Sequence, residues 1–548
     1  MLATVLGYHD QTKHDFHRFA RSRGYLDWST QPHPFRHYEG ARAIQLERAG
    51  PREKRPVAYG QLFVPGEVAA APLDARAISE FLRFALGLSA WKRFGPNRWA
   101  LRVNPSSGNL HPTEGYLVLR PVVGWSTDAG VYHYVSESHL LEQRYRFDEN
   151  VLQRLLQGNP DGSFLAGLTS IHWREAWKYG ERAFRYCQHD VGHAVAALRL
   201  SAALLGWDLR LLPDWSHQAI AAVLGLDREG DFAGAEREEP DCLMLVAPSN
   251  RGRVVLPSES AELVAASRRG EWQGRANRLS GGHVDWPIIE EVARATRRPA
   301  ASGPGLAPGL TALGGHPKKQ QETAGLDARR ILLQRRSAVA YDGVTQTSLE
   351  TFVAILSRTL PGPSPPWDAL WWPPAVHLAL FVHRVEGLTP GFYLLLRRGE
   401  AADLFRSKMQ KEWLWQHPAQ VPEEVPLVLL AQGDCRELAA RLSCGQDIAG
   451  DSFLSLGMIA EFESTLERWG PWFYRNLFWE SGVIGQALYL EAEAVGARGT
   501  GIGCFFDDPV HEVLGLTGHT FQSLYHFTLG APVEDRRMTT TSGYDWEL

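Results

Sequence analysis

The most regular feature of the sequence is a long apolar pattern of helical type that occurs twice. Between Asp190 and Gly206, apolar residues fall on nearly every side of a helical turn, as in a helix buried all round. The closing glycine suits the position just after a helix. The run from Ser481 to Gly496 ends in the same way. We therefore expect two long buried helices, one in each half of the chain.

Shorter apolar and aromatic runs predict strands upstream of these helices. Residues 116–119 and 130–132 match residues 377–380 and 391–393 at a constant offset of 261. β-branched and aromatic residues followed by turn residues are typical of strands. Each half is thus expected to be an α+β unit, with an antiparallel or mixed sheet flanked by helices and a long central helix.

The two halves also share identical residues over a gapless stretch. Residues 180–226 align with residues 470–516 at an offset of 290, and 12 of 47 positions are identical, where chance gives about three. We interpret the chain as two copies of one domain that form an intramolecular pseudo-dimer. A site at the boundary between the copies could take parts from each.

Polar stretches rich in glycine, proline or serine predict where the copies join. Residues 301–322 are rich in glycine and proline, and residues 249–282 are rich in arginine, serine and glycine. A short helix is expected to follow Val284-Asp285-Trp286-Pro287. We expect a first domain over residues 1–250, a linker over 251–325 and a second domain over 326–548.

Composition excludes several classes of function. The chain has 548 residues, 44% hydrophobic and 22% charged, which is ordinary for a globular protein of two or more domains. A net charge of -5 offers no basic field to nucleic acid. Five scattered cysteines indicate reduced thiols and no disulfide framework or zinc site. Because no signal-peptide or membrane-spanning pattern occurs, we expect a cytoplasmic protein that binds neither nucleic acid nor membrane.

Three motifs offer candidate chemistry. Arg335-Arg336-Ser337 is a donor set suited to phosphate, where each charge-assisted hydrogen bond contributes roughly 1.5–3 kcal/mol; a solvated arginine pair is the alternative. Pro105-Ser106-Ser107-Gly108-Asn109 lets the backbone approach a flat ligand, with the Asn109 amide at a ring edge; an ordinary loop between strands is the alternative. Gly499-Thr500-Gly501-Ile502-Gly503 offers backbone N–H groups to a ring nitrogen or phosphate, although such a motif alone is weak evidence.

Together these motifs resemble the nitroreductase-like flavoprotein superfamily, whose dimers bind FMN between their subunits. The chain is most similar to SagB/ThcOx-type dehydrogenases, which include the azoline oxidases of peptide natural-product pathways. The resemblance covers nearly the whole chain, and further segments that carry it are Tyr8–Lys13, Leu26–Trp28 and Lys178–Tyr186.

The resemblance implies one complete FMN site that is split between the copies. The second copy would supply the phosphate clamp Arg335, Arg336 and Ser337, the Gly501-Ile502-Gly503 loop opposite the flavin N5, and Arg536 and Arg537. The first copy would support the ring with Pro105, Ser106, Ser107, Gly108 and Asn109. The reciprocal site lacks these features, because Pro32-His33-Pro34, Trp367-Asp368-Ala369 and Leu211-Leu212-Pro213 occupy the corresponding positions. Arg253 alone has a counterpart, Arg537, so one FMN per chain is expected.

The resemblance also assigns a candidate base. Azoline dehydrogenases of this family are associated with a Lys-Tyr pair acting on the substrate, and Lys178-Tyr179 matches it, whereas the second copy has Arg468-Trp469. A partly desolvated lysine can have a lowered pKa, and a tyrosine can relay a proton; a surface lysine beside a packing tyrosine is the alternative. Arg182 and Tyr186 are expected to line the same substrate cleft. His189 and His193 have no third ligand, so we expect them in the core or between the copies, with no metal site.

These expectations combine into an FMN-dependent oxidoreductase. It would oxidise a peptide-derived heterocycle, azoline to azole or a related substrate, by hydride transfer to the flavin N5. The enzymatic alternative is a nitro or quinone reductase that takes electrons from NAD(P)H. A scaffold subunit of a peptide-modifying complex, with or without flavin, is the alternative from another class.

Overall fold

The chain is described here from a computed structural model that covers residues 1–48, 56–122, 125, 128–249, 254–300 and 325–547. Residues 301–322 of the expected linker, and Arg253, lie outside the described residues. Residues 1–300 are called the first half, and residues 325–547 the second half. Within the described ranges, none of the helices has both the length and the apolarity that a membrane span requires.

Each half contains one large antiparallel sheet, and the strands of these two sheets follow the same order. The first half has seven strands in the order β2 (Arg42–Gln45), β7 (Leu140–Phe147), β6 (Ala129–Val135), β5 (Thr113–Leu119), β8 (Phe164–Ser170), β10 (Glu239–Pro248) and β9 (Trp207–Leu211). The second half has six, in the order β14 (Leu427–Gln432), β13 (Gly391–Leu395), β12 (Val376–Val382), β15 (Leu454–Glu461), β17 (Phe521–Gly530) and β16 (Arg498–Ile502). Apart from the extra edge strand β2, the second order repeats the first.

The strands predicted from the apolar runs are present and pair as the repeat requires. Residues 116–119 lie in β5 and residues 130–132 in β6, with Leu117 opposite Tyr132. Residues 377–380 lie in β12 and residues 391–393 in β13, with Leu380 opposite Tyr393. All these pairings are antiparallel, so the α+β class and the two similar units are confirmed.

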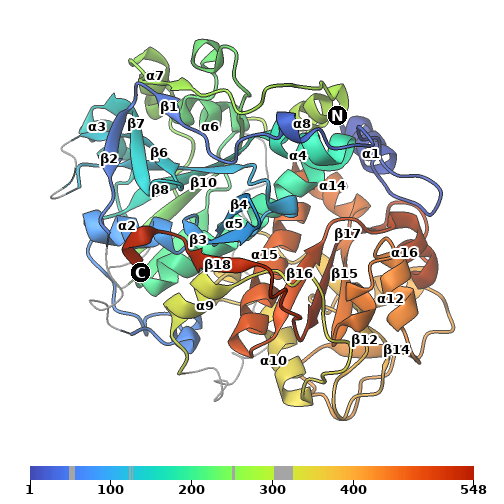
Figure 1. The fold of residues 1–548 in the computed structure, drawn as a ribbon. Coiled ribbons are helices and arrows are strands. Elements are labelled where there is room, and N and C mark those ends of the chain that lie inside the picture. The colour runs from blue at the N-terminus through green and yellow to red at the C-terminus, as the bar shows by residue number, and fades with distance from the viewer. Residues whose placement is uncertain (49–55, 123–124, 126–127, 250–253, 301–324, 548) are drawn as a thin grey trace.

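The two long helices pack against each other between the sheets. They are α5 (Ala183–Leu204) and α15 (Tyr474–Ala494), and both are buried along their length. Gly206 and Gly496 follow them with φ of 65° and 74°, as expected for the glycine after a helix. Figure 1 shows α5 and α15 at the centre of the molecule. We call the surface along which they pack the seam.

Two glycines from the repeat lie where these helices cross. A Cβ atom added at Gly192 would lie 2.2 Å from the Trp479 carbonyl oxygen. A Cβ added at Gly482 would lie 2.3 Å from the His189 carbonyl oxygen. The helix backbones are therefore in direct contact at these two positions, which are equivalent in the 290-residue offset.

Both ends of the chain cross the seam. The C-terminal strand β18 (Thr539–Ser542) pairs with β3 (Leu88–Phe94) of the first half, which also pairs with β4 (Asn97–Arg102). Figure 1 shows the C-terminus beside β3 and helix α2 (Ala75–Arg83). In the other direction, α1 (Leu2–Gln11) places Asp10 2.9 Å from His519. Each half thus contributes a terminal element to the other.

Much of the stretch expected as a linker is folded onto the first half. It contains α7 (Ala261–Arg269), β11 (Arg275–Ala276) and α8 (Pro287–Ala295), the last being the short helix expected after Val284–Pro287. β11 pairs with β1 (Tyr38–Glu39), and α8 packs on α1. The division at residues 250 and 326 itself stays a prediction.

Other helices cover the outer faces of the sheets and the two ends of the seam. Their bounds are α3 (Glu149–Leu155), α4 (His172–Tyr179), α6 (His217–Leu224), α9 (Ala328–Gln334), α10 (Leu349–Thr359), α11 (Ala401–Lys408), α12 (Arg436–Leu442), α13 (Ile448–Asp451), α14 (Glu463–Trp469) and α16 (Asp507–Leu514). α2 packs on α5, and α10 packs on α15.

Candidate functional site

The Pro105–Asn109 loop is fixed to the central helix of its own half. The Ser107 backbone N–H and hydroxyl both donate to Asp190 on α5, at 3.1 Å. Gly108 and Asn109 have φ of 59° and 60°, a left-handed conformation that glycine and asparagine adopt most readily. The Asn109 amide donates to the Ala100 carbonyl at 2.9 Å, and its oxygen lies 3.0 Å from His111 Nε2. Both ends of this amide have protein partners, so its expected contact with a ring edge stays a prediction.

Lys178 and Tyr179 lie directly against this loop. They end helix α4, and Gly180 follows with φ of 55°. A Cβ added at Gly108 would lie 2.6 Å from the Tyr179 hydroxyl and 3.0 Å from Lys178 Nζ. Both side chains are half-buried, and Lys178 Nζ lies 5.1 Å from the centre of the Tyr179 ring. The structure therefore brings the candidate base and the candidate ring-binding loop together.

Two carboxyl groups lie beneath the loop, and sequence reasoning missed both. Glu175 precedes Lys178 by about one helical turn, and its Oε1 lies 3.4 Å from the Ser106 hydroxyl, while its Oε2 is buried without a hydrogen-bond partner. Burial raises the pKa of Glu175, and the nearby Asp190 adds to the effect. Burial also raises the pKa of Asp190 to about 7. The pair can therefore hold protons near neutral pH beside Lys178.

Tyr186 and Arg182 connect the first half to the Gly501–Gly503 loop. The Tyr186 hydroxyl and Arg182 Nη2 donate to the Gly503 carbonyl at 3.0 and 3.3 Å. The Tyr186 ring lies 4.4 Å from the Tyr179 ring, centre to centre. A Cβ at Gly503 would lie 2.1 Å from the Tyr186 ring, so only glycine fits at this approach. Tyr186 thus connects the candidate base of one half to the glycine loop of the other.

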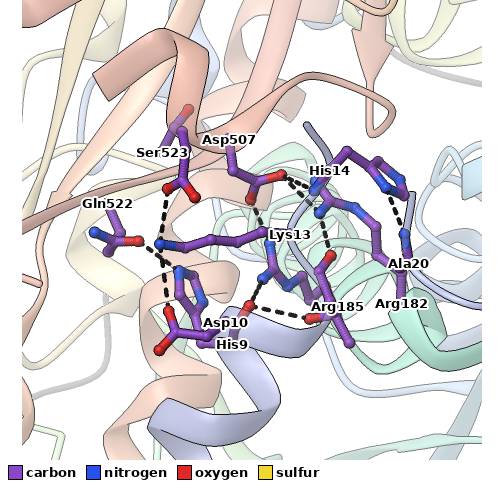
Figure 2. A network of polar contacts seen from close by, with 12 residues as sticks. His9, Asp10, Lys13, His14, Ala20, Arg182, Arg185, Asp507, Gln522 and Ser523 are labelled. Carbon is purple, nitrogen blue, oxygen red and sulfur yellow. Dashed lines mark hydrogen bonds and ion pairs between the residues drawn. The ribbon is translucent and has the colours of Figure 1, made fainter. Parts of the chain in front are cut away.

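Arg182 is held from behind by a buried acid of the second half. Arg182 and Arg185 donate to Asp507, at 2.9 and 2.7 Å, and these residues are drawn in Figure 2. The flanking Lys13 forms an ion pair with Asp508 at 2.9 Å. Arg182 is only 1% exposed and donates to the Gly503 carbonyl, so it holds the Gly503 loop in position. Its expected contact with a substrate stays a prediction.

The Arg335-Arg336-Ser337 motif of the second half directly follows helix α9. Arg335 donates to the Val103 and Arg102 carbonyls, both at 3.1 Å, directly before the Pro105 loop. Arg336 donates to the Ser89 carbonyl at 3.0 Å. The second half's motif is therefore joined through backbone carbonyls to β3 and to the stretch that precedes the first half's loop.

The two arginines are neighbours; Arg335 is buried and Arg336 is half-buried. Neither forms an ion pair with any carboxylate of the described residues, and Glu493 acts on them only through space. Burial, aided by the Arg335 charge, lowers the pKa of Arg336 to about 9. Lys92 is half-buried nearby, and burial, together with Arg336, lowers its pKa. Such a cluster is stabilised by an anion, so the residues present fit a phosphate group.

Tyr489 connects the serine of this motif to the glycine loop. Its hydroxyl lies 2.8 Å from the Ser337 hydroxyl and accepts from the Gly501 N–H at 3.0 Å. The Arg335 guanidinium lies 4.9 Å from the centre of the Tyr489 ring. Tyr489 was not predicted from the sequence. The repeat does supply a signal: the equivalent residue at the 290 offset is Arg199, so the two copies differ at this position.

The remaining predicted residues lie around the site without joining it. Arg536 and Arg537 are exposed, and Arg537 is paired with Asp535 at 2.7 Å, so their role toward phosphate stays a prediction. Ile502 is buried in the second-half core. His189 stacks on Tyr525 at 4.2 Å, and His193 Nε2 lies 3.3 Å from the Tyr525 hydroxyl, which confirms that both histidines lie at the seam.

The other end of the seam, where the repeat would place a second site, contains a buried ion pair. Arg199 donates to both oxygens of Asp368, at 2.9 and 2.8 Å, and Asp368 stands in the place of the Ser106–Gly108 loop. Pro32, His33 and Pro34 do not lie at the seam: the His33 and Pro34 carbonyls accept hydrogen bonds from Arg174 and Arg102 of their own half. The two equivalent regions of the seam therefore have different chemistry.

Two cavities lie away from the seam, at the start of α4. One has a volume of about 1260 Å³ and the other about 570 Å³, and His172, Trp173 and Arg297 line both. Neither is lined by Gly108, Ser337 or Gly503. Because the motifs converge at the seam, we place the candidate site there and not in these cavities.

The chain is similar to several known proteins. No protein-family model matches the chain. The chain is 31% identical over 146 residues to the "putative nitroreductase" MJ1384 of Methanocaldococcus jannaschii, covering 26% of this chain and 68% of that protein. It is 29% identical over 171 residues to the trifolitoxin-processing protein TfxB of Rhizobium leguminosarum bv. trifolii, covering 29% of this chain but only 45% of that protein.

A solved structure shares the fold over nearly its whole length. The crystal structure of a "putative nitroreductase" from Anabaena variabilis superposes with a TM-score of 0.69, at 23% sequence identity, over 97% of this chain and 99% of that one. This likeness establishes that the two-unit architecture exists in a solved protein. Together with the 31% identity over two thirds of the Methanocaldococcus jannaschii protein, it leads to one conclusion: the chain belongs to the nitroreductase family of oxidoreductases.

Proposed function

We propose that the seam holds one FMN per chain, in a site built from both halves. The phosphate would bind Arg335, Arg336 and Ser337. The ring would lie between the Ser106–Gly108 loop of the first half and the Gly501–Gly503 loop of the second. The support is a pair of arginines that have no carboxylate ion-pair partner among the described residues. Arg335 is buried and donates to the Val103 carbonyl just upstream of the loop, and Arg336 is half-buried and donates to the Ser89 carbonyl. We also propose that the domains divide near residues 250 and 326.

The reaction proposed is a two-electron oxidation. When bound, FMN would supply the hydride acceptor. The observation that carries the proposal is the contact of both Lys178 and Tyr179 with Gly108, at the boundary of the two halves. Lys178 would accept the proton that the substrate loses. Burial raises the pKa of Tyr179, so its hydroxyl stays protonated and can relay that proton.

The substrate proposed is a heterocycle or backbone unit of a modified peptide, oxidised from azoline to azole or by a related step. The Lys-Tyr pair favours it, and so does the likeness to a protein named for processing trifolitoxin. The second half has Arg468 and Trp469 in the equivalent positions, and these cannot act as a base at neutral pH. Only one end of the seam would therefore be catalytic.

Two other functions lead to different observations. An NAD(P)H-dependent nitro or quinone reductase would use the same flavin site with NAD(P)H as electron donor. A scaffold of a peptide-modifying complex would keep the fold without turnover. The buried ion pair of Arg199 with Asp368, in the place of a second site, is compatible with such a loss of chemistry.

An absorption spectrum of the purified protein, followed by anaerobic addition of NADPH, separates the three. Our proposal predicts a flavin spectrum that NADPH bleaches slowly and an azoline-containing peptide bleaches fast. Fast bleaching by NADPH alone would favour the reductase. A protein that stays colourless after FMN is added would contradict both enzymatic functions.

A further inference from the structure

Two cysteines that are distant in sequence meet beside the glycine loop. Cys504 directly follows Gly503, and Cys444 follows helix α12. Their Sγ atoms lie 2.7 Å apart, closer than two sulfur atoms that merely pack together. Both side chains are partly exposed, and both are free thiols in this structure. The scattered spacing of the cysteines along the chain does not predict this contact.

The backbone on each side of the pair is fixed, so that the sulfur atoms are held facing each other. The Phe506 N–H donates to the Leu442 carbonyl at 2.9 Å. The Gln446 amide donates to the Ser443 and Cys504 carbonyls, at 2.7 and 3.1 Å. Cys444 itself has φ of 57°, which is uncommon for a residue with a side chain and persists only where its surroundings impose it.

The surroundings make the two thiols unequal. Either can donate in the hydrogen bond between them, and the Arg182 charge favours the thiolate form of both. The hydrogen bond with Cys444 lowers the pKa of Cys504, burial opposes this, and Arg182 adds to the lowering. The same hydrogen bond, with burial, raises the pKa of Cys444. A thiolate is the nucleophile in disulfide exchange, so Cys504 would attack and Cys444 would resolve.

We propose that Cys444 and Cys504 are a redox-active pair that closes to a disulfide by exchange with a low-molecular-weight disulfide. The Cys504 thiolate attacks one sulfur of the reagent, forms a mixed disulfide and displaces one thiolate. Cys444 gives up its proton and attacks Cys504 Sγ, which displaces the second thiolate. The two cysteines are oxidised to one disulfide, and the reagent is reduced to two thiols that take up the two protons lost by the cysteines.

Closure would tie the glycine loop to α12 at the edge of the seam. The Gly503 carbonyl already accepts from Tyr186 and Arg182, so the new bond would add a covalent link next to these contacts. The exchange needs only the two thiols and the reagent. It therefore does not depend on the proposed flavin chemistry.

The test uses the reduced full-length chain and oxidised glutathione as the probe, with intact-mass measurement and peptide mapping. We expect the chain to lose the mass of two hydrogen atoms, with Cys444 and Cys504 cross-linked. The variant Cys444→Ser should keep one glutathione on Cys504, because the resolving thiol is missing. Cys435→Ser is the control: its thiol is half-exposed and donates to the Gly433 carbonyl, and this variant should cross-link as the wild type does.

Two results would overturn the proposal in the wild-type chain itself, whether or not the variants fold. One is glutathione retained on either cysteine without a cross-link. The other is a chain in which both Cys444 and Cys504 stay reduced after exposure to the probe. Neither result depends on whether flavin is bound, so each is distinguishable from failure of the proposed function.

Discussion

Replacing Gly192 by alanine tests whether the crossing of α5 and α15 holds the two halves together. The added Cβ would lie 2.2 Å from the Trp479 carbonyl oxygen and 2.8 Å from the carbon atoms next to it. Since these are backbone atoms, no side-chain rotation relieves the overlap. Ordinary van der Waals contact begins at 3.4 Å, so the helices must separate by about 1.2 Å at this point.

The energetic cost follows from that separation. A gap of 0.5–1 Å loses roughly a quarter to a half of the dispersion energy of the atoms that part. Overpacking of a close-packed interior costs typically about 1–3 kcal/mol and sometimes more. Alanine regains about 1 kcal/mol of helix propensity over glycine. Since the overlap is with backbone, we take the upper end of the overpacking cost, about 3 kcal/mol, and subtract the propensity gain; the free energy of unfolding should then fall by about 2 kcal/mol.

Equilibrium urea unfolding, followed by circular dichroism, measures the change. The matched control is Gly7→Ala in α1, because nothing lies within 4 Å of the added Cβ there and the helix propensity gained is the same. Gly482→Ala should behave as Gly192→Ala does, and the double variant should lose less than both combined, because one substitution already parts the helices. Equal midpoints for Gly192→Ala and Gly7→Ala would refute the reasoning.

Three further predictions concern the groups around the seam. Burial raises the pKa of Asp190 to about 7 from an ordinary 3.8. Between these values the folded chain keeps a proton that the unfolded chain loses. The free energy of unfolding should therefore fall as pH rises from about 4 to about 7, by about 4 kcal/mol for this group. Asp190→Asn should flatten that pH dependence in urea unfolding, and an unchanged slope would contradict the assignment. Lys178→Met and Tyr179→Phe should each retain bound flavin but slow oxidation of an azoline-containing peptide by about 10²–10⁴-fold, and normal rates would exclude the pair as base and relay. Asp368→Ala should destabilise the fold by about 3 kcal/mol, because the buried Arg199 loses its two-point partner and keeps only the longer contact with Asp208 at 3.4 Å. The flavin content of the folded protein should not change, and a loss of flavin would contradict the assignment of the site to the other end of the seam.

The sequence predicts the parts of this fold that are set by local periodicity or by the repeat. The strands over residues 116–119 and 377–380 and the helices ending near Gly206 and Gly496 are local patterns, and all are present. Gly192 and Gly482 were visible only as identical positions, and the structure shows why a side chain is excluded from both.

Elements with few apolar residues were harder to predict. α7 was not predicted, and α8 was expected as a short helix but within a stretch assigned to the linker. Only a few buried residues, such as Leu263, Ile289 and Val292, carry the packing of these helices. The pairing of β18 with β3 depends on contacts between opposite ends of the chain, and no local pattern reports such contacts.

The candidate site was predictable as motifs but not as an arrangement. Lys178, Gly108, Ser337 and Gly503 were each named from the sequence, whereas their convergence depends on how the halves pack. Glu175 and Asp190 were missed because a buried carboxyl pair has no sequence signature. Tyr489 could have been found by comparing the two copies, because its equivalent in the first copy is Arg199. In the structure Tyr489 contacts Ser337, whereas Arg199 contacts Asp368.

The central claim is that one flavin binds per chain, in a site to which both halves contribute. The direct measurement is the ratio of released FMN to protein in the wild type, in Arg335→Ala and in Ser107→Trp. Arg436→Ala and Ser407→Trp are matched controls, since both residues are exposed and far from the seam motifs in sequence. We predict a ratio near one for the wild type and both controls, and near zero for Arg335→Ala and Ser107→Trp. A ratio near two in the wild type, or loss of flavin in only one of the two site variants, would contradict the account.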